Sequence, residues 1–152
     1  MGLLGETKPV KKPILGVSLY PEQETMKEIE NYLTMASRYG FTKIFTSMFS
    51  VPGTKEEVFD YFKNFCDLAH KHGMKVSGDC NTAFFKKMGA SESDISIFKE
   101  MGIDIIRMDL PYFDQRDVIL INNPYNITIE LSSCMIQAVR MALENGANPK
   151  NF

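Results

Sequence analysis

Short runs of alternating apolar and polar residues recur along the chain, separated by patterns with helical spacing. A glycine ends each of the clearest helix patterns, at Gly40 and Gly73, and a strand pattern begins within three residues of each glycine. The strand patterns cover residues 14–20, 43–49, 75–79, 104–109 and 127–133. This alternation of strand and helix is typical of a parallel α/β barrel.

The number of strand–helix units determines how much of a barrel we expect. A TIM barrel has eight units and typically about 250 residues, whereas this chain has 152 residues and five strand patterns. The sequence therefore predicts an α/β fold of the TIM (β/α)8-barrel type that is incomplete, with about five parallel strands and helices on the outer face. Residues 1–13 are expected to form a flexible leader, and residues 14–152 the N-terminal part of the barrel domain.

The helix patterns differ in how clearly they begin. Thr25 with Glu28, and Thr54 with Glu57, have the spacing of a capping box. They predict one helix over 26–39 and a second from Thr54 to the glycine at position 73. Weaker patterns predict a helix capped near Ser91, a helical turn at 83–87, a short helix at 117–122 and a last helix at 133–144.

Most of the strand patterns have one apolar and one polar face, whereas buried parallel strands usually read as continuous apolar runs. In a barrel the apolar face must meet the helices, and the polar face must point towards the barrel axis. The polar positions on the inner face are Ser18 and Tyr20 on the first strand, Ser77, Asp79 and Asn81 on the third, Arg107 and Asp109 on the fourth, and Thr128, Glu130 and Ser132 on the fifth.

Three carboxylates, Asp79, Asp109 and Glu130, stand at the C-terminal ends of consecutive strands, where TIM barrels hold their active sites. Neighbouring strands are about 4.8 Å apart, so we expect the three carboxylates to lie in one small pocket. Arg107, one layer deeper, would favour an ionised Asp109, which suits a base or nucleophile. Glu130 is farther from any cation in the sequence, which suits an acid. A purely structural ion-pair layer is the alternative.

Composition excludes several classes of function. A net charge of −2 gives no electrostatic reason to expect nucleic-acid binding, and no apolar run approaches the length of a membrane span. The chain has an odd number of cysteines, and their spacing is not that of a metal site. We therefore expect buried thiols in a reducing cytoplasm at Cys66, Cys80 and Cys134. We expect no metal or cofactor. No His stands at a strand end, which argues against a serine nucleophile.

The strand segments resemble, in order, the barrel half of bacterial 6-phospho-N-acetylmuramidases. The resemblance covers residues 14–152 and rests on the segments LGVSLYPE, FTKIFTSMFS, GMKVSGDCN, MGIDIIRMDLP and ITIELSS. It implies the first part of a TIM barrel that, in the family, precedes a small C-terminal domain. It also implies cleavage of the disaccharide of 6-phospho-N-acetylmuramic acid and N-acetylglucosamine during cytoplasmic recycling of cell-wall sugars.

A glycosidase normally needs two carboxyl groups that flank the bond it cleaves. Asp109, at the end of the strand with the most ionisable inner face, is our first choice for acid or base, with Glu130 and Asp79 as partners. At Ser132 the chain departs from the family, which usually has Asn, and a hydroxyl cannot replace an amide's paired donor and acceptor. The implied substrate-binding residues, for a phosphorylated amino sugar, are Ser18, Tyr20, Ser47, Asn81 and Arg107.

Two other functions stay open from the sequence. A phosphosugar aldolase or epimerase barrel would need a strand-end Lys or a set of metal-binding His residues, and Lys75 stands at the wrong end of its strand. A phosphosugar-binding or vestigial module is the non-enzymatic alternative. A truncated barrel would leave sheet edges open, so self-association through those edges is also expected.

Overall fold

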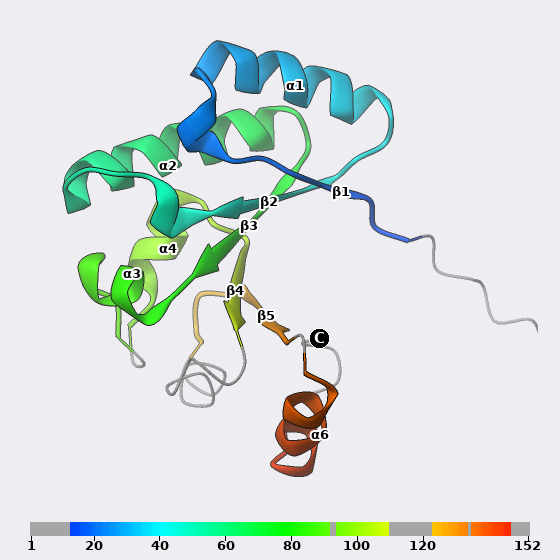
Figure 1. Cartoon of the computed structure of the whole chain (residues 1–152). Coiled ribbons are helices and arrows are strands. Elements are labelled where there is room, and N and C mark those ends of the chain that lie inside the picture. The colour runs from blue at the N-terminus through cyan, green and yellow to red at the C-terminus, as the bar shows by residue number, and fades with distance from the viewer. Residues whose placement is uncertain (1–12, 92–93, 110–122, 134, 147–152) are drawn as a thin grey trace, which may run out of the picture.

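The computed structural model describes residues 13–91, 94–109, 123–133 and 135–146 (Figure 1). Its centre is one sheet in the order β1-β2-β3-β4-β5, and every neighbouring pair is parallel. The sheet does not close, which confirms the predicted incomplete barrel of parallel strands. The strands are β1 Gly16–Ser18, β2 Lys43–Ser47, β3 Lys75–Cys80, β4 Ile105–Asp109 and β5 Thr128–Ser132.

The main helices cover the outer face of this sheet. Figure 1 shows α1, α2 and α4 on the same side of the strands, with α6 beyond β5. The α-helices are α1 Met26–Arg38, α2 Lys55–Lys71, α3 Thr82–Lys87, α4 Ser96–Met101 and α6 Ile136–Glu144, and two 3-10 turns are η1 Pro21–Gln23 and η2 Met48–Ser50. None of the helices in the described ranges is long and apolar enough to cross a membrane.

Capping boxes begin α1 and α2, as predicted. The Thr25 hydroxyl oxygen accepts from the Glu28 N–H at 3.3 Å, and the Thr25 N–H donates to Glu28 Oε2 at 2.9 Å. Thr54 and Glu57 form the same reciprocal pair at 3.2 and 2.7 Å. Each such N-cap stabilises its helix by about 0.5–2 kcal/mol. The two helices are therefore placed by local signals that the sequence shows directly.

Two helix starts differ from the prediction. Ser91 does not cap α4: it pairs with Asp94 in an isolated bridge, and Asp94 Oδ1 accepts the Ser96 N–H at 2.9 Å. The last helix begins three residues later than expected, because the Ser133 hydroxyl accepts the Met135 N–H at 3.1 Å in a tight turn. Such side-chain bonds to the backbone compete with the first helical turn. The helix expected at 117–122 lies outside the described residues, as does the leader except for its last residue.

The core lies between the sheet and its helices. Ile44, Val76 and Ile106 from three adjacent strands are fully buried against Phe62 and Phe65 of α2. Burial of such side chains contributes roughly 1.5–3 kcal/mol each. The expectation that the apolar strand faces meet the helices is confirmed for these strands.

The prediction of buried thiols is confirmed for two of the three cysteines. Cys66 and Cys80 are free and buried. Burial raises the pKa of both thiols, which keeps them in the unreactive protonated form. Cys134 lies outside the described residues.

The end of α2 is tied to the N-terminal ends of the strands. His70 Nε2 lies 2.8 Å from Asp104 Oδ2, and the same oxygen accepts the Val76 N–H at 2.8 Å. The His70 side chain is exposed, whereas His72 is half-buried. Both histidines lie at the end of the strands opposite Asp109, away from the expected site.

We expect the isolated chain to self-associate and to bind a hydrophobic dye. Among the described residues β1 pairs only with β2, so one strand edge is open. Ile14 and Leu15, at the start of that edge, are 77% and 46% exposed. Open edges with apolar flanks favour pairing between molecules. Light scattering that shows a monodisperse monomer, together with no dye fluorescence, would contradict this prediction.

Candidate active site

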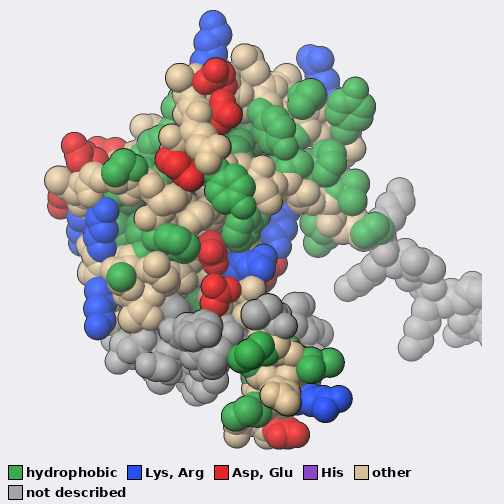
Figure 2. Space-filling view, viewed as in Figure 1, with side chains coloured by type: hydrophobic (Ala, Val, Ile, Leu, Met, Phe, Trp, Pro, Cys, Tyr) green, Lys and Arg blue, Asp and Glu red, His purple; other side chains and the backbone are tan. Residues whose placement is uncertain are grey.

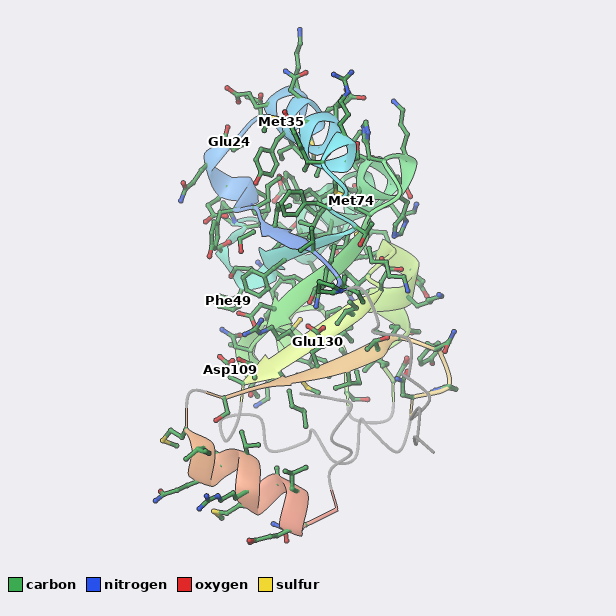
Figure 3. All side chains as sticks on the ribbon, turned by 90° about the vertical axis from the view of Figure 1, so that its right-hand side faces the viewer. Glu24, Met35, Phe49, Met74, Asp109 and Glu130 are labelled. Atoms are coloured by element: carbon green, nitrogen blue, oxygen red, sulfur yellow. The ribbon has the colours of Figure 1, made fainter. Side chains whose placement is uncertain are left out.

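The inner face of the sheet carries one polar row across four strands. Ser47, Asp79, Arg107 and Glu130 are Cα partners in turn from β2 to β5. Asp109 lies in the next row towards the C-terminal ends, beside Ser132. Arg107 therefore lies one row deeper than Asp109, as expected, and level with Asp79 and Glu130. Figure 3 views this face, with Glu130 within the sheet and Asp109 at the end of β4.

Glu130 is held by groups nearer the N-terminal ends of the strands. Its Oε1 forms an ion pair with Lys43 Nζ, and its Oε2 accepts from the Ser77 hydroxyl at 3.2 Å. The expectation that Glu130 lies away from any cation is therefore wrong. Lys43 was missed because it is 87 residues away in the sequence. The carboxylate turns away from Asp109 and fits an ionic layer below the candidate site.

The Arg107 guanidinium is positioned by two neighbours on the inner face. Its Nη2 donates to the Ser132 hydroxyl at 2.8 Å, and its central carbon lies 5.0 Å from the centre of the Phe45 ring. A cation over an aromatic face gains about 0.5–1 kcal/mol at exposed sites. Within the described residues Arg107 forms no ion pair with a carboxylate. Its remaining donors suit an anionic group of a ligand.

The surroundings of the Asp79 carboxyl favour its protonated form. It is half-buried, and burial is the first cause that raises the pKa of Asp79; the charge of Asp109 raises it further, while Arg107 opposes the shift. Asp109, by contrast, is exposed at the end of the next strand. Two carboxyls in different environments at adjacent strand ends are the arrangement that divides acid and base roles.

The other predicted binding residues do not all join this row. Asn81 Oδ1 caps α3 by accepting the Phe84 N–H at 2.8 Å, so part of its amide is already engaged. Ser47 is buried beside Asp79. Ser18 and Tyr20 line a separate cavity of about 360 Å³ between β1 and α1. The structure thus brings Ser47 and Arg107 to the carboxyls and places Ser18 and Tyr20 apart from them.

The described residues contain no group of three or more His, Cys, Asp or Glu side chains arranged to hold a metal ion. The candidate site described above is made of carboxyls, hydroxyls and one guanidinium. Phe45, Lys43 and Ser77 are the inner-face residues that the sequence did not single out as part of the site. Strand alternation places them on the polar face, and only the pairing of distant strands shows what they contact.

A family model described as 6-phospho-N-acetylmuramidase, N-terminal, matches residues 15–152. The chain belongs to this family. The family match agrees with the resemblance of the strand segments. No curated protein sequence gave a significant match.

Solved structures show the same fold in longer chains. An uncharacterized B. cereus protein is 31% identical over 91% of this chain and 36% of its own, with a TM-score of 0.65. A conserved Enterococcus faecalis protein of unknown function has a TM-score of 0.65 at 19% identity, covering 91% of this chain and 38% of its own. Thiamine phosphate pyrophosphorylase from Pyrococcus furiosus has a TM-score of 0.57 at 12% identity, covering 88% and 57%. The chain therefore spans well under half of the first two proteins.

Asparagine at Asp79 is expected to stabilise the fold at neutral pH. The pKa of Asp79 is higher in the folded chain than its ordinary value of 3.8. In the pH range between these two pKa values, the folded state therefore binds more protons than the unfolded state. Stability from this group is present below that window and is lost as pH rises through it. Asn cannot ionise, so Asp79→Asn removes this loss of stability at neutral pH. The free energy of unfolding, measured in urea at about pH 3.5 and pH 7 for both proteins, tests this expectation.

The exposed Asp60 of α2 provides the control for this comparison. Asp60→Asn should leave the difference in unfolding free energy between the two pH values unchanged. An Asp79→Asn protein that is less stable than the unmodified chain at neutral pH would show that the carboxylate is satisfied where it lies.

Proposed function

We propose that this chain contributes the catalytic carboxyls of a glycoside hydrolase that acts on a phosphorylated cell-wall disaccharide. The observation that carries the proposal is the pair Asp79 and Asp109 at adjacent strand ends, where burial and the neighbouring charge favour a proton on Asp79. Membership of the 6-phospho-N-acetylmuramidase family supports the substrate, 6-phospho-N-acetylmuramic acid joined to N-acetylglucosamine. The reaction would belong to the recycling of cell-wall sugars in the cytoplasm.

The geometry supports a division of labour between the two carboxyls. Glycoside hydrolysis uses one acid to protonate the leaving oxygen and one carboxylate to activate water or to attack the sugar carbon. Asp79 is the better acid because its surroundings favour the protonated form. Asp109 then serves as base or nucleophile and stabilises positive charge on the sugar ring. Glu130, which contacts Lys43 and Ser77, would have a structural role below the site.

Arg107 supplies the positive charge that an anionic sugar needs. Its guanidinium is held over Phe45 and bonded to Ser132, so it enters the site with a defined orientation. The phosphate or the lactyl carboxylate of the substrate would bind to its remaining N–H groups. The Ser47 hydroxyl, beside Asp79 in the same row, would hydrogen-bond a sugar hydroxyl.

Incubation with the phosphorylated disaccharide tests the proposal. This chain and the longer B. cereus protein would each be mixed with the substrate, and release of N-acetylglucosamine would be measured. The unphosphorylated disaccharide is the control for recognition of the charge. We expect phosphate-dependent cleavage by the longer protein, and its absence from both proteins would contradict the proposal.

Sugar binding without turnover is a second candidate, favoured by the open sheet and by the small share of the longer proteins that this chain spans. Calorimetry with the product, 6-phospho-N-acetylmuramic acid, separates the two functions. Saturable binding by this chain with no cleavage of the disaccharide would identify a binding module, whereas cleavage would identify an enzyme.

A further inference from the structure

Arg107 stands between two carboxyls in the polar row of the inner face, yet it forms an ion pair with neither. Its Cα partners on β3 and β5 are Asp79 and Glu130. Neighbouring strands are about 4.8 Å apart, so a guanidinium at this position is within reach of a carboxylate on either side. Among the described residues it pairs with no carboxylate, and it donates instead to the Ser132 hydroxyl at 2.8 Å. Arg107 thus stays unpaired although Glu130 stands beside it.

Lys43 is the group that holds the Glu130 carboxylate away from Arg107. Its Nζ pairs with Glu130 Oε1, while the Ser77 hydroxyl donates to the other oxygen, Oε2, at 3.2 Å. Near the centre of Figure 2, basic and acidic side chains lie next to one another over the region of β4 and β5. Both oxygens of Glu130 are therefore engaged by residues of β2 and β3, towards the N-terminal ends of the strands.

The same strand that carries Lys43 also supports Arg107. The central carbon of the guanidinium lies 5.0 Å from the centre of the Phe45 ring, and Phe45 stands two positions after Lys43 on β2. Side chains two positions apart on a strand share one face. β2 consequently presents a cation for Glu130 and, beside it, an aromatic ring for Arg107. These two contacts keep two oppositely charged neighbours of the row apart.

The ion pair is shielded enough for its loss to have an effect. The side chains of Lys43 and Glu130 are 25% and 28% exposed. A carboxylate in such surroundings is costly when its cation is removed. Arg107 is the cation in its own row, and an arginine binds a carboxylate through two parallel hydrogen bonds. Without Lys43, we expect Glu130 to turn to Arg107 and to occupy the donors that an anionic ligand needs.

Lys75 is the other lysine near this carboxylate. It is the Cα partner of Lys43 on β3, and it lines, together with Lys43 and Glu130, a cavity of about 410 Å³. Lys75 is exposed, and none of the described carboxylates pairs with it. It carries the same charge on the same face without the contact, which makes it the matched control for Lys43.

We propose that Lys43 is a positioning residue, which holds Glu130 and so keeps the Arg107 guanidinium free to bind the phosphate group of a ligand. Among the described residues Lys43 pairs with Glu130 alone, so it acts on Arg107 only through that carboxylate. The ligand class, a phosphorylated sugar, rests on the function proposed above. The effect of Lys43 on Arg107 requires no cleavage of that sugar.

Titration with inorganic phosphate, followed by NMR, tests the proposal. Phosphate would be added to the ¹⁵N-labelled full chain, and the shift of the Arg107 Nε–H signal would give the dissociation constant. Lys43→Met keeps a long side chain and removes its charge. We expect it to weaken phosphate binding at least about tenfold, because Arg107 loses charge-assisted hydrogen bonds to phosphate when Glu130 occupies its donors. Lys75→Met should leave the dissociation constant unchanged.

Two further variants separate capture of Arg107 from a merely structural role of Lys43. Lys43→Met together with Glu130→Gln leaves the net charge unchanged and gives Arg107 no carboxylate on β5, so phosphate binding should return to that of the unmodified chain. Lys43→Arg keeps the cation and should also bind phosphate normally. Urea unfolding of each variant checks that the fold is retained, and the double variant carries the test if Lys43→Met does not fold.

Three results would overturn the proposal. The first is phosphate binding by Lys43→Met that equals binding by Lys75→Met. The second is a double variant that binds phosphate at least tenfold more weakly than the unmodified chain does. The third is an Arg107 signal that phosphate does not shift in the unmodified chain. Failure of the proposed function gives a different result, in which phosphate shifts the Arg107 signal but the phosphorylated disaccharide is neither bound nor cleaved.

Discussion

Asparagine in place of Asp109, or of Asp79, is expected to slow glycoside cleavage by about 10²–10⁴-fold, the usual contribution of general acid–base catalysis. Gln in place of Glu130 should cost less, because Lys43 and Ser77 already engage both of its oxygens below the site. The substitutions would be made at the matched positions of the longer B. cereus protein, and kcat and KM for the phosphorylated disaccharide would be measured.

The choice of leaving group separates the two aspartates. An aryl glycoside with an activated leaving group needs no proton from the enzyme, so it should restore cleavage in the Asp79→Asn protein. The same substrate should not rescue Asp109→Asn, because that carboxylate acts on the sugar carbon or on water. Full activity of both variants, alongside loss in Glu130→Gln, would mean that the carboxyl pair has been misassigned.

The fold could be predicted from local signals because the chain repeats them. Capping boxes at Thr25 and Thr54 mark two helix starts, and Gly40 and Gly73 mark their ends. These features act within four residues, so the sequence displays them directly. The start of α4 was misplaced because the Ser91 hydroxyl accepts the Asp94 N–H before the helix begins, and Asp94 rather than Ser91 bonds to the N–H of the first turn.

The candidate site could be predicted only as a set of residue types on one face. Alternation along each strand shows that Asp79 and Arg107 point inward. It does not show the stagger between strands, and only the observed register sets Arg107 opposite Asp79 and Glu130 and one row below Asp109. The partnership of Lys43 with Glu130 joins β2 to β5, and no local pattern links residues so far apart. The acid role consequently moves from Glu130 to Asp79 in our proposal.

Alanine in place of Gly102 is expected to destabilise the fold more than alanine at the other helix-ending glycines. Gly102 has φ +89°, a left-handed conformation that costs a residue with a Cβ about 1–2 kcal/mol. A Cβ there would also lie 2.9 Å from Cys66 Cβ and 3.5 Å from His70 Cε1. Crowding a packed core adds about 1–3 kcal/mol. Urea unfolding at neutral pH measures the sum.

Gly40 supplies the control that separates the two causes. Its φ is +84°, nearly the same as that of Gly102, but apart from its chain neighbours no atom of the described residues lies within 4 Å of the added Cβ. Gly40→Ala should therefore show the conformational cost alone, and its difference from Gly102→Ala measures the contact of α4's end with α2. Cys66 lies on α2 and Gly102 leads into β4, so this contact helps to set the height of Arg107 and Asp109 in the sheet. Equal destabilisation by the two substitutions would mean that α2 moves aside freely and that the close packing at Gly102 does not position β4.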